Sequence, residues 1–368
     1  ERFRQTDAAE YQFEGQWKRA EVSHEVIEVR NGDPVEMDVA VTHHGPVIAG
    51  DPAGGYGIAL KYTATSEPNR GSESILRMLQ TSSADELEES MRSWVDPCNN
   101  FLYCDIHGNI GYLNRGKVPI RSMENAWLPV PGWSGQHEWR DFIPFEELAR
   151  SRNPDTGYIV TANNRIVGKD YPHYIALDYA PEYRARRILQ RLNPLNRATA
   201  GDMAGIHAER VSVPAQTYCR LLAGIEAPDE LSRKAQETLA DWDGAMDPDA
   251  VAPTIYSAFR LRLNSVVLKH LLGPLSGESF DTTGRGAPGH LNQLSAVLAT
   301  MALANDASLL PPGCDWKSML RRALIDGVSD MRERLGDDMD TWQWGTVHYT
   351  RPRHTLSNSL PELASQLD

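Results

Sequence analysis

The sequence lacks the patterns typical of membrane, nucleic-acid-binding and nucleotide-binding proteins. It contains no run of about 18 apolar residues, so we expect no membrane span. Acidic residues outnumber basic ones, 50 to 37, and the net charge of -13 argues against nucleic acid as a partner. A P-loop, a dinucleotide-binding glycine fingerprint, a His-Glu-x-x-His motif and a Gly-x-Ser-x-Gly nucleophile elbow are also missing.

Cysteine is scarce, and its spacing does not fit a zinc site. Cys98 and Cys104 flank an expected strand, where six residues at about 3.3 Å each would separate them beyond disulfide reach. We therefore expect free thiols at Cys98, Cys104, Cys219 and Cys314, which do not settle the redox compartment.

Both ends of the chain look like cuts in a longer polypeptide. The first residue is Glu1 rather than Met, residues 1–4 lack the apolar region of a signal peptide, and residues 365–368 break off without a stop signal. The 368 residues are enough for one large domain or two ordinary ones.

The first part of the chain alternates β patterns with one helical stretch. Residues 74–95 have a helical apolar stripe with a capped restart at Ser83. Residues 115–147 are rich in proline, glycine and tryptophan, which indicates a wrapping loop anchored by Trp133 and Trp139. The expected strands cover residues 21–29, 35–41, 58–62 and 101–112.

Helical periodicity then dominates a block of about 150 residues, the size of an ordinary domain. Residues 342–349 revert to a β pattern, so we expect the chain to re-enter the sheet there. The expected helices cover residues 182–192, 200–209, 213–225, 229–242, 252–272, 290–304 and 316–335.

A short β pattern at residues 158–161 ends on two adjacent amides, Asn163 and Asn164. An amide held at a strand end is a fixed hydrogen-bond donor that can stabilise an oxyanion during acyl transfer. The alternative is that both side chains merely tie down a turn.

Other polar residues give weaker signals. His43 and His44 suggest a metal, but neighbours on a strand point to opposite faces and no third ligand has a suitable spacing, so we expect no metal site. Arg184, Arg186 and Arg187 share one amphipathic helix, and one of them could turn inward to hold a carboxylate.

Several phrases together resemble the penicillin amidase family of N-terminal-nucleophile hydrolases. They occur in the family's order along nearly the whole chain. The matching phrases are residues 42–48, 103–112, 128–132, 142–148, 157–165, 242–249, 344–349 and 353–354.

The resemblance implies a mixed α/β (α+β) fold, a four-layer αββα sandwich with a large helical insertion. Residues 1–180 would belong to this core, residues 181–340 would form the helical block, and residues 341–368 would return to the sheet. The family's closing strands would follow beyond Asp368.

The resemblance also implies acyl transfer from an amide by a serine at the N-terminus of the mature β-chain. Autocatalytic cleavage would expose this serine, and its own α-amine would be the general base. By motif, Asn163 resembles the side-chain half of the oxyanion hole, and Arg184 resembles the arginine that orients the site and substrate. Asn99 and Ile75 resemble positions of the acyl pocket. Asn99 is polar, which disfavours a phenylacetyl group there.

In the family the serine precedes the position of Glu1, so we expect residues 1–368 alone to be inactive. The expected partner is the remainder of the precursor, which comprises the α-subunit and the N-terminal segment of the β-subunit. The resemblance implies a small-molecule amide substrate, a periplasmic or extracellular location and no required cofactor. The aspartates that usually bind a structural calcium ion also precede Glu1. Two alternatives stay open: an acyl-homoserine-lactone acylase, and a non-catalytic binding or scaffold protein that kept the fold.

Overall fold

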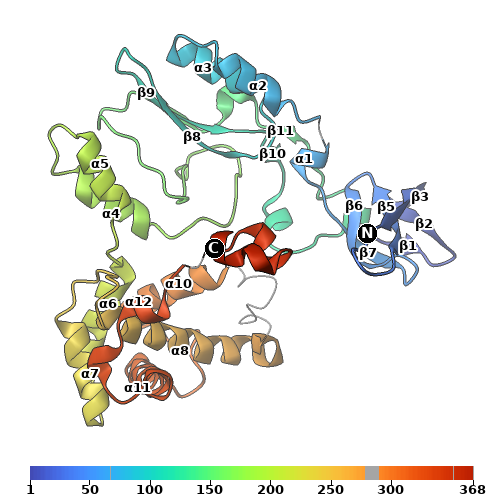
Figure 1. The fold of residues 1–368 in the computed structure, drawn as a ribbon. Coiled ribbons are helices and arrows are strands. Elements are labelled where there is room, and N and C mark those ends of the chain that lie inside the picture. The colour runs from blue at the N-terminus through green and yellow to red at the C-terminus, as the bar shows by residue number, and fades with distance from the viewer. Residues whose placement is uncertain (67, 278–289, 351, 368) are drawn as a thin grey trace. The chain divides into compact units, whose positions relative to one another are not determined.

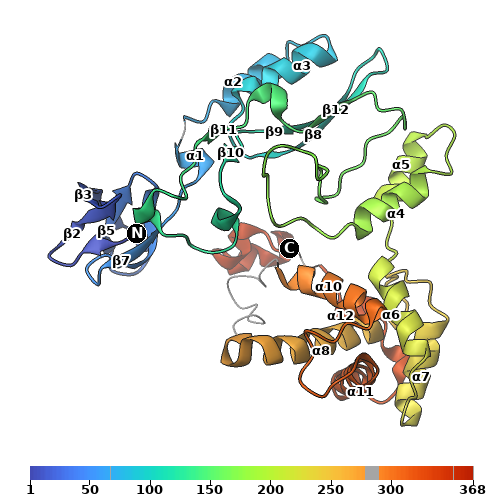
Figure 2. The ribbon, with the colours of Figure 1, turned by 180° about the vertical axis from the view of Figure 1, so that it is seen from behind.

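The protein was analysed as a computed structural model that describes residues 1–66, 68–277, 290–350 and 352–367. The chain divides into two compact units, Glu1–Tyr179 and Ala180–Asp368, which are considered separately (Figures 1 and 2). The first unit holds the strands and the second is helical, so the predicted mixed α/β composition is confirmed.

Two small antiparallel sheets open the first unit. One has the order β1-β2-β3 and the other the order β4-β5-β6-β7. Phe3, Tyr11 and Ala20 form a shared core against which Ala40 and Val47 pack. The strands are β1 (Phe3–Arg4), β2 (Asp7–Phe13), β3 (Gln16–Arg19), β4 (Glu21–Ile27), β5 (Val35–Thr42), β6 (Gly45–Asp51) and β7 (Tyr56–Ala59).

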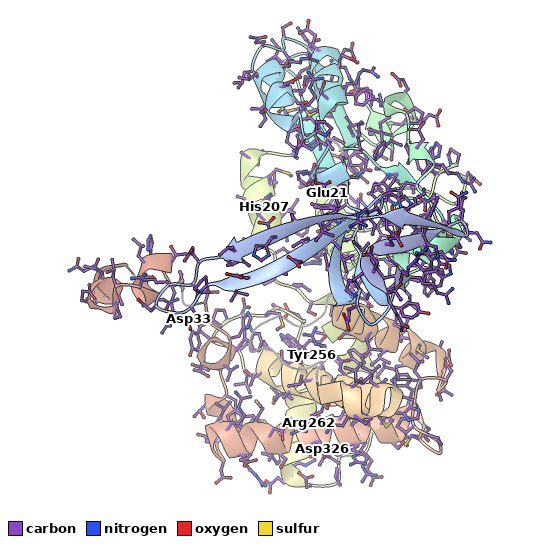
Figure 3. The ribbon with its side chains drawn as sticks, turned by 90° about the vertical axis from the view of Figure 1, so that its right-hand side faces the viewer. Glu21, Asp33, His207, Tyr256, Arg262 and Asp326 are labelled. Atoms are coloured by element: carbon purple, nitrogen blue, oxygen red, sulfur yellow. The ribbon has the colours of Figure 1, made fainter. Side chains whose placement is uncertain are left out.

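Strands β4 and β5 form the predicted hairpin, which Figure 3 shows between Glu21 and Asp33. Strand β6 pairs with β5 only at its base, through Val41 and Thr42, so most of the hairpin has no third strand. Its apolar side chains are consequently exposed, for example Val26 at 50%. An isolated two-stranded hairpin is only marginally stable in water, so this arm gains little from its own side-chain packing.

The second half of this unit packs helices and a loop on a sheet of order β12-β9-β8. Met91, Leu113 and Ile143 are central to its core. The predicted helix restart is confirmed, because the Ser83 side chain accepts a hydrogen bond from Glu86 N. The elements are α1 (Thr63–Ser66), α2 (Gly71–Met78), α3 (Ala84–Ser90), η1 (Met91–Ser93), β8 (Asn99–Cys104), β9 (Ile110–Arg115) and β12 (Arg150–Arg152).

The proline-rich loop wraps its own unit, as predicted. The Trp133 ring meets Tyr56 edge-on at 6.2 Å, and the Lys61 ammonium lies 5.5 Å from the Trp139 ring. Within the loop lie β10 (Pro119–Ile120), η2 (Met123–Ala126), η3 (Gly132–Ser134), β11 (Asp141–Phe142) and η4 (Phe145–Glu147).

The helices of the second unit lie close to the segments that the sequence predicts as helical. Helices α8 and α11 pack along each other, and Arg262 of α8 forms an ion pair with Asp330 of α11 beside the core that contains Tyr256 (Figure 3). The helices are α4 (Tyr183–Leu192), α5 (Ala200–His207), α6 (Val213–Ala223), α7 (Glu230–Ala240), α8 (Ala252–Leu272), η5 (Gly273–Leu275), α10 (His290–Ala304) and α11 (Trp316–Leu335).

The strand predicted at residues 342–349 is wrong, because the segment contains a short helix at Trp344–Val347 and is irregular elsewhere. Trp342 is fully buried in the helical core, and Trp344 N donates to Ala250 O. Its aromatic residues therefore reflect burial against helices and not sheet pairing. The described C-terminal elements are η6 (Met339–Thr341), α12 (Trp344–Val347), η7 (Thr355–Asn358), η8 (Pro361–Leu363) and α13 (Ala364–Leu367).

The strand predicted at residues 158–161 is also wrong, because these residues have an irregular backbone. The predicted free state of all four cysteines is confirmed. Among the described residues, no helix is both long enough and apolar enough to cross a membrane.

Gly327 is a testable packing position at the contact of α8 and α11. A Cβ atom there would lie 2.8 Å from Phe259 N and 2.9 Å from Ala258 C, which are backbone atoms that cannot rotate away. We expect Gly327→Ala to lower the free energy of unfolding by about 1–3 kcal/mol, although alanine favours a helix. Urea unfolding followed by circular dichroism measures the change.

Gly205→Ala in α5 is the matched control. A Cβ atom at residue 205 would have its nearest contact at 3.5 Å, to the flexible end of Arg191, so we expect a gain of about 0.5–1 kcal/mol. Equal effects of the two substitutions would contradict the close approach of α8 and α11.

Candidate functional site

The predicted amide pair lies at a turn in the first unit. Asn163 is exposed and has a left-handed backbone, with φ of 61°. Asn164 ties the turn, because its Oδ1 accepts from Ala162 N at 2.9 Å. The turn-forming alternative therefore describes Asn164, whereas the oxyanion role of Asn163 stays a prediction.

Strand β8 holds the segment that carries Asn163. Asn100 Nδ2 donates to Thr161 Oγ1 at 2.8 Å, and Tyr112 OH of the neighbouring β9 donates to Asn100 Oδ1 at 2.7 Å. Sequence reasoning missed Asn100 and Tyr112. Strand alternation offered a signal, since Asn99 and Asn100 must face opposite sides of the sheet and only one of them can reach this segment.

The two predicted acyl-pocket residues lie on different elements of the first unit. Asn99 of β8 is half-buried, and its Oδ1 accepts from Arg115 Nε at 2.8 Å. The Arg115 guanidinium in turn lies 3.9 Å from the Trp94 ring. Ile75 of α2 is 49% exposed. Asn99 is thus held by an arginine, and a shared pocket with Ile75 stays a prediction.

The arginine-rich helix α4 borders a cavity of about 340 Å³ in the helical unit, lined by Arg184 and Arg187 among others. Arg186 pairs with Glu182 on the surface. Arg187 is the arginine that turns inward to a carboxylate, with Nη2 lying 2.9 Å from Glu209 Oε2. Arg184 lines the same cavity and is exposed, and its orienting role stays a prediction.

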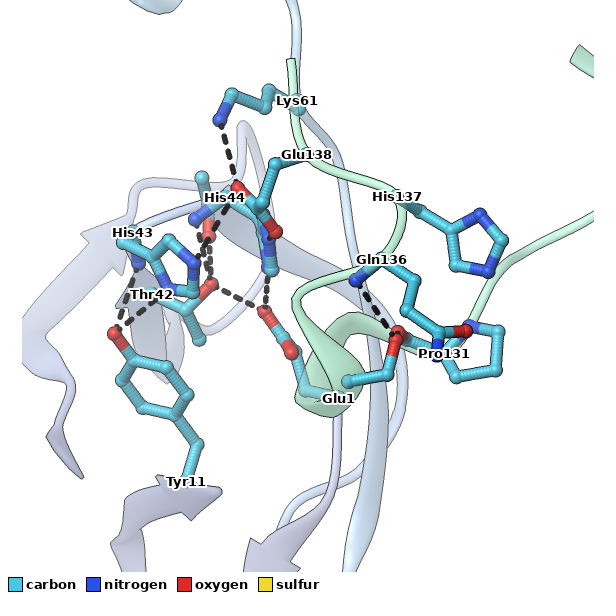
Figure 4. A network of polar contacts seen from close by, with 12 residues as sticks. Glu1, Tyr11, Thr42, His43, His44, Lys61, Pro131, Gln136, His137 and Glu138 are labelled. Carbon is cyan, nitrogen blue, oxygen red and sulfur yellow. Dashed lines mark hydrogen bonds and ion pairs between the residues drawn. The ribbon is translucent and has the colours of Figure 1, made fainter. Parts of the chain in front are cut away.

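A polar cluster that the sequence did not reveal joins Glu1, His44 and Glu138 in the first unit (Figure 4). His44 lies between the two carboxylates, with Nδ1 2.7 Å from Glu1 Oε1 and Nε2 2.6 Å from Glu138 Oε1. The Glu1 side chain is only 1% exposed. It also accepts a hydrogen bond from Thr42 Oγ1 at 2.7 Å, and Lys61 Nζ lies 3.7 Å from Glu138 Oε2.

His43 extends this cluster on the other side. Its ring lies 3.8 Å from the ring of His44, its Nδ1 lies 3.1 Å from Tyr11 OH, and its Nε2 lies 3.7 Å from Glu138 Oε2. The expectation that the two histidines point to opposite faces is wrong, because both lie in the turn between β5 and β6. A third potential metal ligand, Glu138, comes from far along the chain.

The electrostatics of the cluster favour one charge pattern. Burial by itself would lower the pKa of His44, but hydrogen bonds to Glu1 and Glu138 outweigh it and raise that pKa. Burial opposes ionisation of Glu1 and Glu138, yet their hydrogen bonds keep the pKa of both carboxyls lowered. Burial and the charge of His44 lower the pKa of His43. These contacts favour the charged form of His44 between two carboxylates.

The cluster borders a cavity of about 410 Å³, whose lining includes His44, Lys61, Trp127, Glu138 and Trp139. Cationic, anionic and aromatic groups thus meet at one opening in the first unit. The arrangement can hold a proton between carboxylates, and its imidazole and carboxylate groups are of the kinds that bind a metal ion.

His44→Ala tests the strength of the cluster. The substitution leaves the buried Glu1 carboxylate with Thr42 but without its cation, and we expect it to lower the free energy of unfolding by about 2–4 kcal/mol. His24→Ala is the control, because His24 contacts Asp38 at 2.9 Å on the exposed hairpin and should cost less than about 1 kcal/mol. Urea unfolding measures both, and equal losses would contradict the role given to Glu1.

Comparison with known proteins assigns the chain to a family. A family model described as Penicillin amidase matches residues 1–366. Over 354 residues the chain is 35% identical to the penicillin acylase 2 proenzyme of Pseudomonas sp. (strain SE83), which covers 96% of this chain and 44% of that relative. An acyl-homoserine lactone acylase QuiP of Pseudomonas fluorescens is 25% identical over 365 residues, covering 94% of this chain and 45% of the relative.

The fold agrees with this assignment. The structure of a thermostable penicillin G acylase from Alcaligenes faecalis superposes with a TM-score of 0.74 at 21% identity, covering 93% of this chain and 66% of that one. The chain spans less than half the length of the curated relatives named above. From the match along residues 1–366, the chain belongs to the penicillin amidase family.

Proposed function

We propose that the longer protein containing this chain is an acylase that hydrolyses a linear amide, and that the chain is most of its β-subunit. The observation that carries the proposal is the family match along residues 1–366. Relatives named for penicillin and for acyl-homoserine lactones both support an amide substrate.

The proposed reaction begins on a serine supplied from outside the chain, at a terminus exposed by autocatalytic cleavage. Its hydroxyl oxygen attacks the amide carbonyl while the α-amine of the same residue takes the hydroxyl proton. The carbonyl oxygen becomes an oxyanion, and the C–N bond then breaks as the amine leaves with that proton. Water next attacks the acyl-enzyme ester, releasing the acid and regenerating the serine.

Within this scheme Asn163 donates its amide hydrogen to the oxyanion. The support from this structure is positional: the residue sits at a left-handed turn, and the segment just before it is bonded to β8 through Asn100. Because such donors are effective where water is excluded, the exposed Asn163 requires a covering segment from the rest of the longer protein.

Arg184 is proposed to orient the substrate and the site amide. The support from this structure is positional: Arg184 is exposed on α4 and lines the cavity of about 340 Å³ in the helical unit.

Asn99 and Ile75 are proposed to line the acyl pocket. The carboxamide of Asn99 is held by Arg115, which adds a polar and charged wall that an aromatic phenylacetyl group would have to desolvate. This supports a more polar acyl group or a different binding pose. Hydrolysis of an acyl-homoserine lactone is the second candidate, favoured by the relatives of that name.

The proposed partner is the remainder of the precursor, with which the strands of the first unit would complete the four-layer αββα sandwich. The exposed apolar residues of the hairpin, including Val22, Val26 and Met37, support a covering surface. The family places such enzymes in the periplasm or outside the cell, which is the compartment we propose.

A structural calcium ion would need ligands from outside the chain. Among the described residues, the cluster His43, His44 and Glu138 is the one group of potential metal ligands. Two imidazoles do not suit calcium, which prefers six to eight oxygen ligands. No step of the proposed reaction passes through calcium.

Replacing Asn163 in the longer protein tests the oxyanion role. Asn163→Gly keeps the left-handed backbone and removes the carboxamide, and Asn163→Asp keeps the size and removes the donor. We expect both to lower kcat by about 10²–10³-fold with little change in unfolding. Asn31→Gly is the control, because Asn31 has a φ of 62° in the hairpin turn. Full activity of both Asn163 variants would refute the role.

Residues 1–368 alone should release no acid from a panel of penicillin and acyl-homoserine lactone amides, whereas the longer protein should. The physical reason is that the fragment holds neither the serine nor the covering segment of the proposed site. Chromatography measures the released acid. Activity of the fragment would contradict a nucleophile outside the chain, and inactivity of the longer protein would favour the scaffold alternative.

A further inference from the structure

We propose that His43, His44 and Glu138 form a zinc-binding site. Their ligand atoms, two imidazole nitrogens and a carboxylate oxygen, all lie within 4.8 Å of one another. The inference does not depend on the acylase proposal, because it uses only contacts inside the first unit.

The spacing is close to that of zinc ligands. In a tetrahedral site with bonds of about 2.0–2.1 Å, neighbouring ligand atoms are about 3.3–3.5 Å apart. His43 Nε2 lies 3.7 Å from Glu138 Oε2, and His44 Nε2 lies 2.6 Å from Glu138 Oε1. Each of these two separations therefore differs by under about 1 Å from the spacing in a tetrahedral site.

Each histidine has a polar contact at Nδ1, and that of His44 is a carboxylate, a kind of outer partner that zinc-binding histidines use (Figure 4). His44 Nδ1 is bonded to the buried Glu1 carboxylate at 2.7 Å, and His43 Nδ1 lies 3.1 Å from Tyr11 OH. These contacts fix both rings and leave the Nε2 atoms facing Glu138.

The charge of the site can accommodate the ion. Zinc binds a histidine nitrogen that carries no proton, so protons and zinc compete for His44 Nε2. The Glu1 and Glu138 carboxylates then balance the two positive charges. Lys61, which lines the adjoining cavity, is the competing cation at 3.7 Å from Glu138 and must withdraw into that cavity.

The cavity of about 410 Å³ supplies the fourth position. His44 and Glu138 both line it, so a water molecule can complete the tetrahedron from that side. Two imidazoles with one carboxylate and an open position suit zinc and cobalt and not calcium or magnesium. The bound ion would fasten the β5–β6 turn to the loop that carries Glu138.

Cobalt(II) titration of the metal-free chain tests the site, because tetrahedral cobalt gives a visible absorption band and zinc then displaces it. We expect one equivalent of cobalt to bind and one equivalent of zinc to abolish the band. His43→Ala and Glu138→Gln should weaken binding by at least about 100-fold. Both variants keep the contact between His44 and Glu1, so neither loses the stability that this contact provides.

His24→Ala is the matched control, because His24 also lies between two carboxylates, at 2.9 Å from Asp38 and 3.7 Å from Glu36. This variant should bind cobalt like the unmodified chain. Absence of a tetrahedral band, unchanged binding in Glu138→Gln, or loss of binding in His24→Ala would each overturn the site.

Discussion

The buried Glu1 carboxylate is the constraint on which the first unit depends. A carboxylate removed from water is costly unless a cation and hydrogen bonds compensate for it. His44 and Thr42 supply that compensation from the β5–β6 turn, and Glu138 holds the other face of the His44 ring from the wrapping loop. One ion cluster therefore fixes three distant stretches of sequence, and the cavity beside it is a consequence of that convergence.

The helical unit is organised by packing and not by charge. Its core contains large apolar side chains such as Phe259, Leu263 and Leu324, and Gly327 lets the α8 and α11 backbones approach closely. This unit resembles an ordinary self-contained helical domain. The first unit differs, because its hairpin carries several exposed apolar side chains.

That contrast fits a chain spanning less than half the length of its relatives. The proposed acylase site is correspondingly divided. Asn163 and Arg184 are both exposed, and the oxyanion role proposed for Asn163 is effective where water is excluded. The contacts seen here fix the positions of supporting residues such as Asn100, bonded to Thr161, and Arg187, paired with Glu209.

The sequence by itself determined the helices, because apolar spacing, Ser83 as a cap, and Gly and Pro breaks are local signals. It also determined the hairpin and, through its ordered phrases, the family. Tertiary structure decided the rest. Aromatic residues at 342–349 look like a strand locally, but Trp342 is buried against helices and Trp344 begins a short helix. Glu1 and His44 meet across a separation of 43 positions, and His44 and Glu138 meet across a separation of 94. No spacing rule contains these contacts, because long-range charge pairing exists only once the chain is folded.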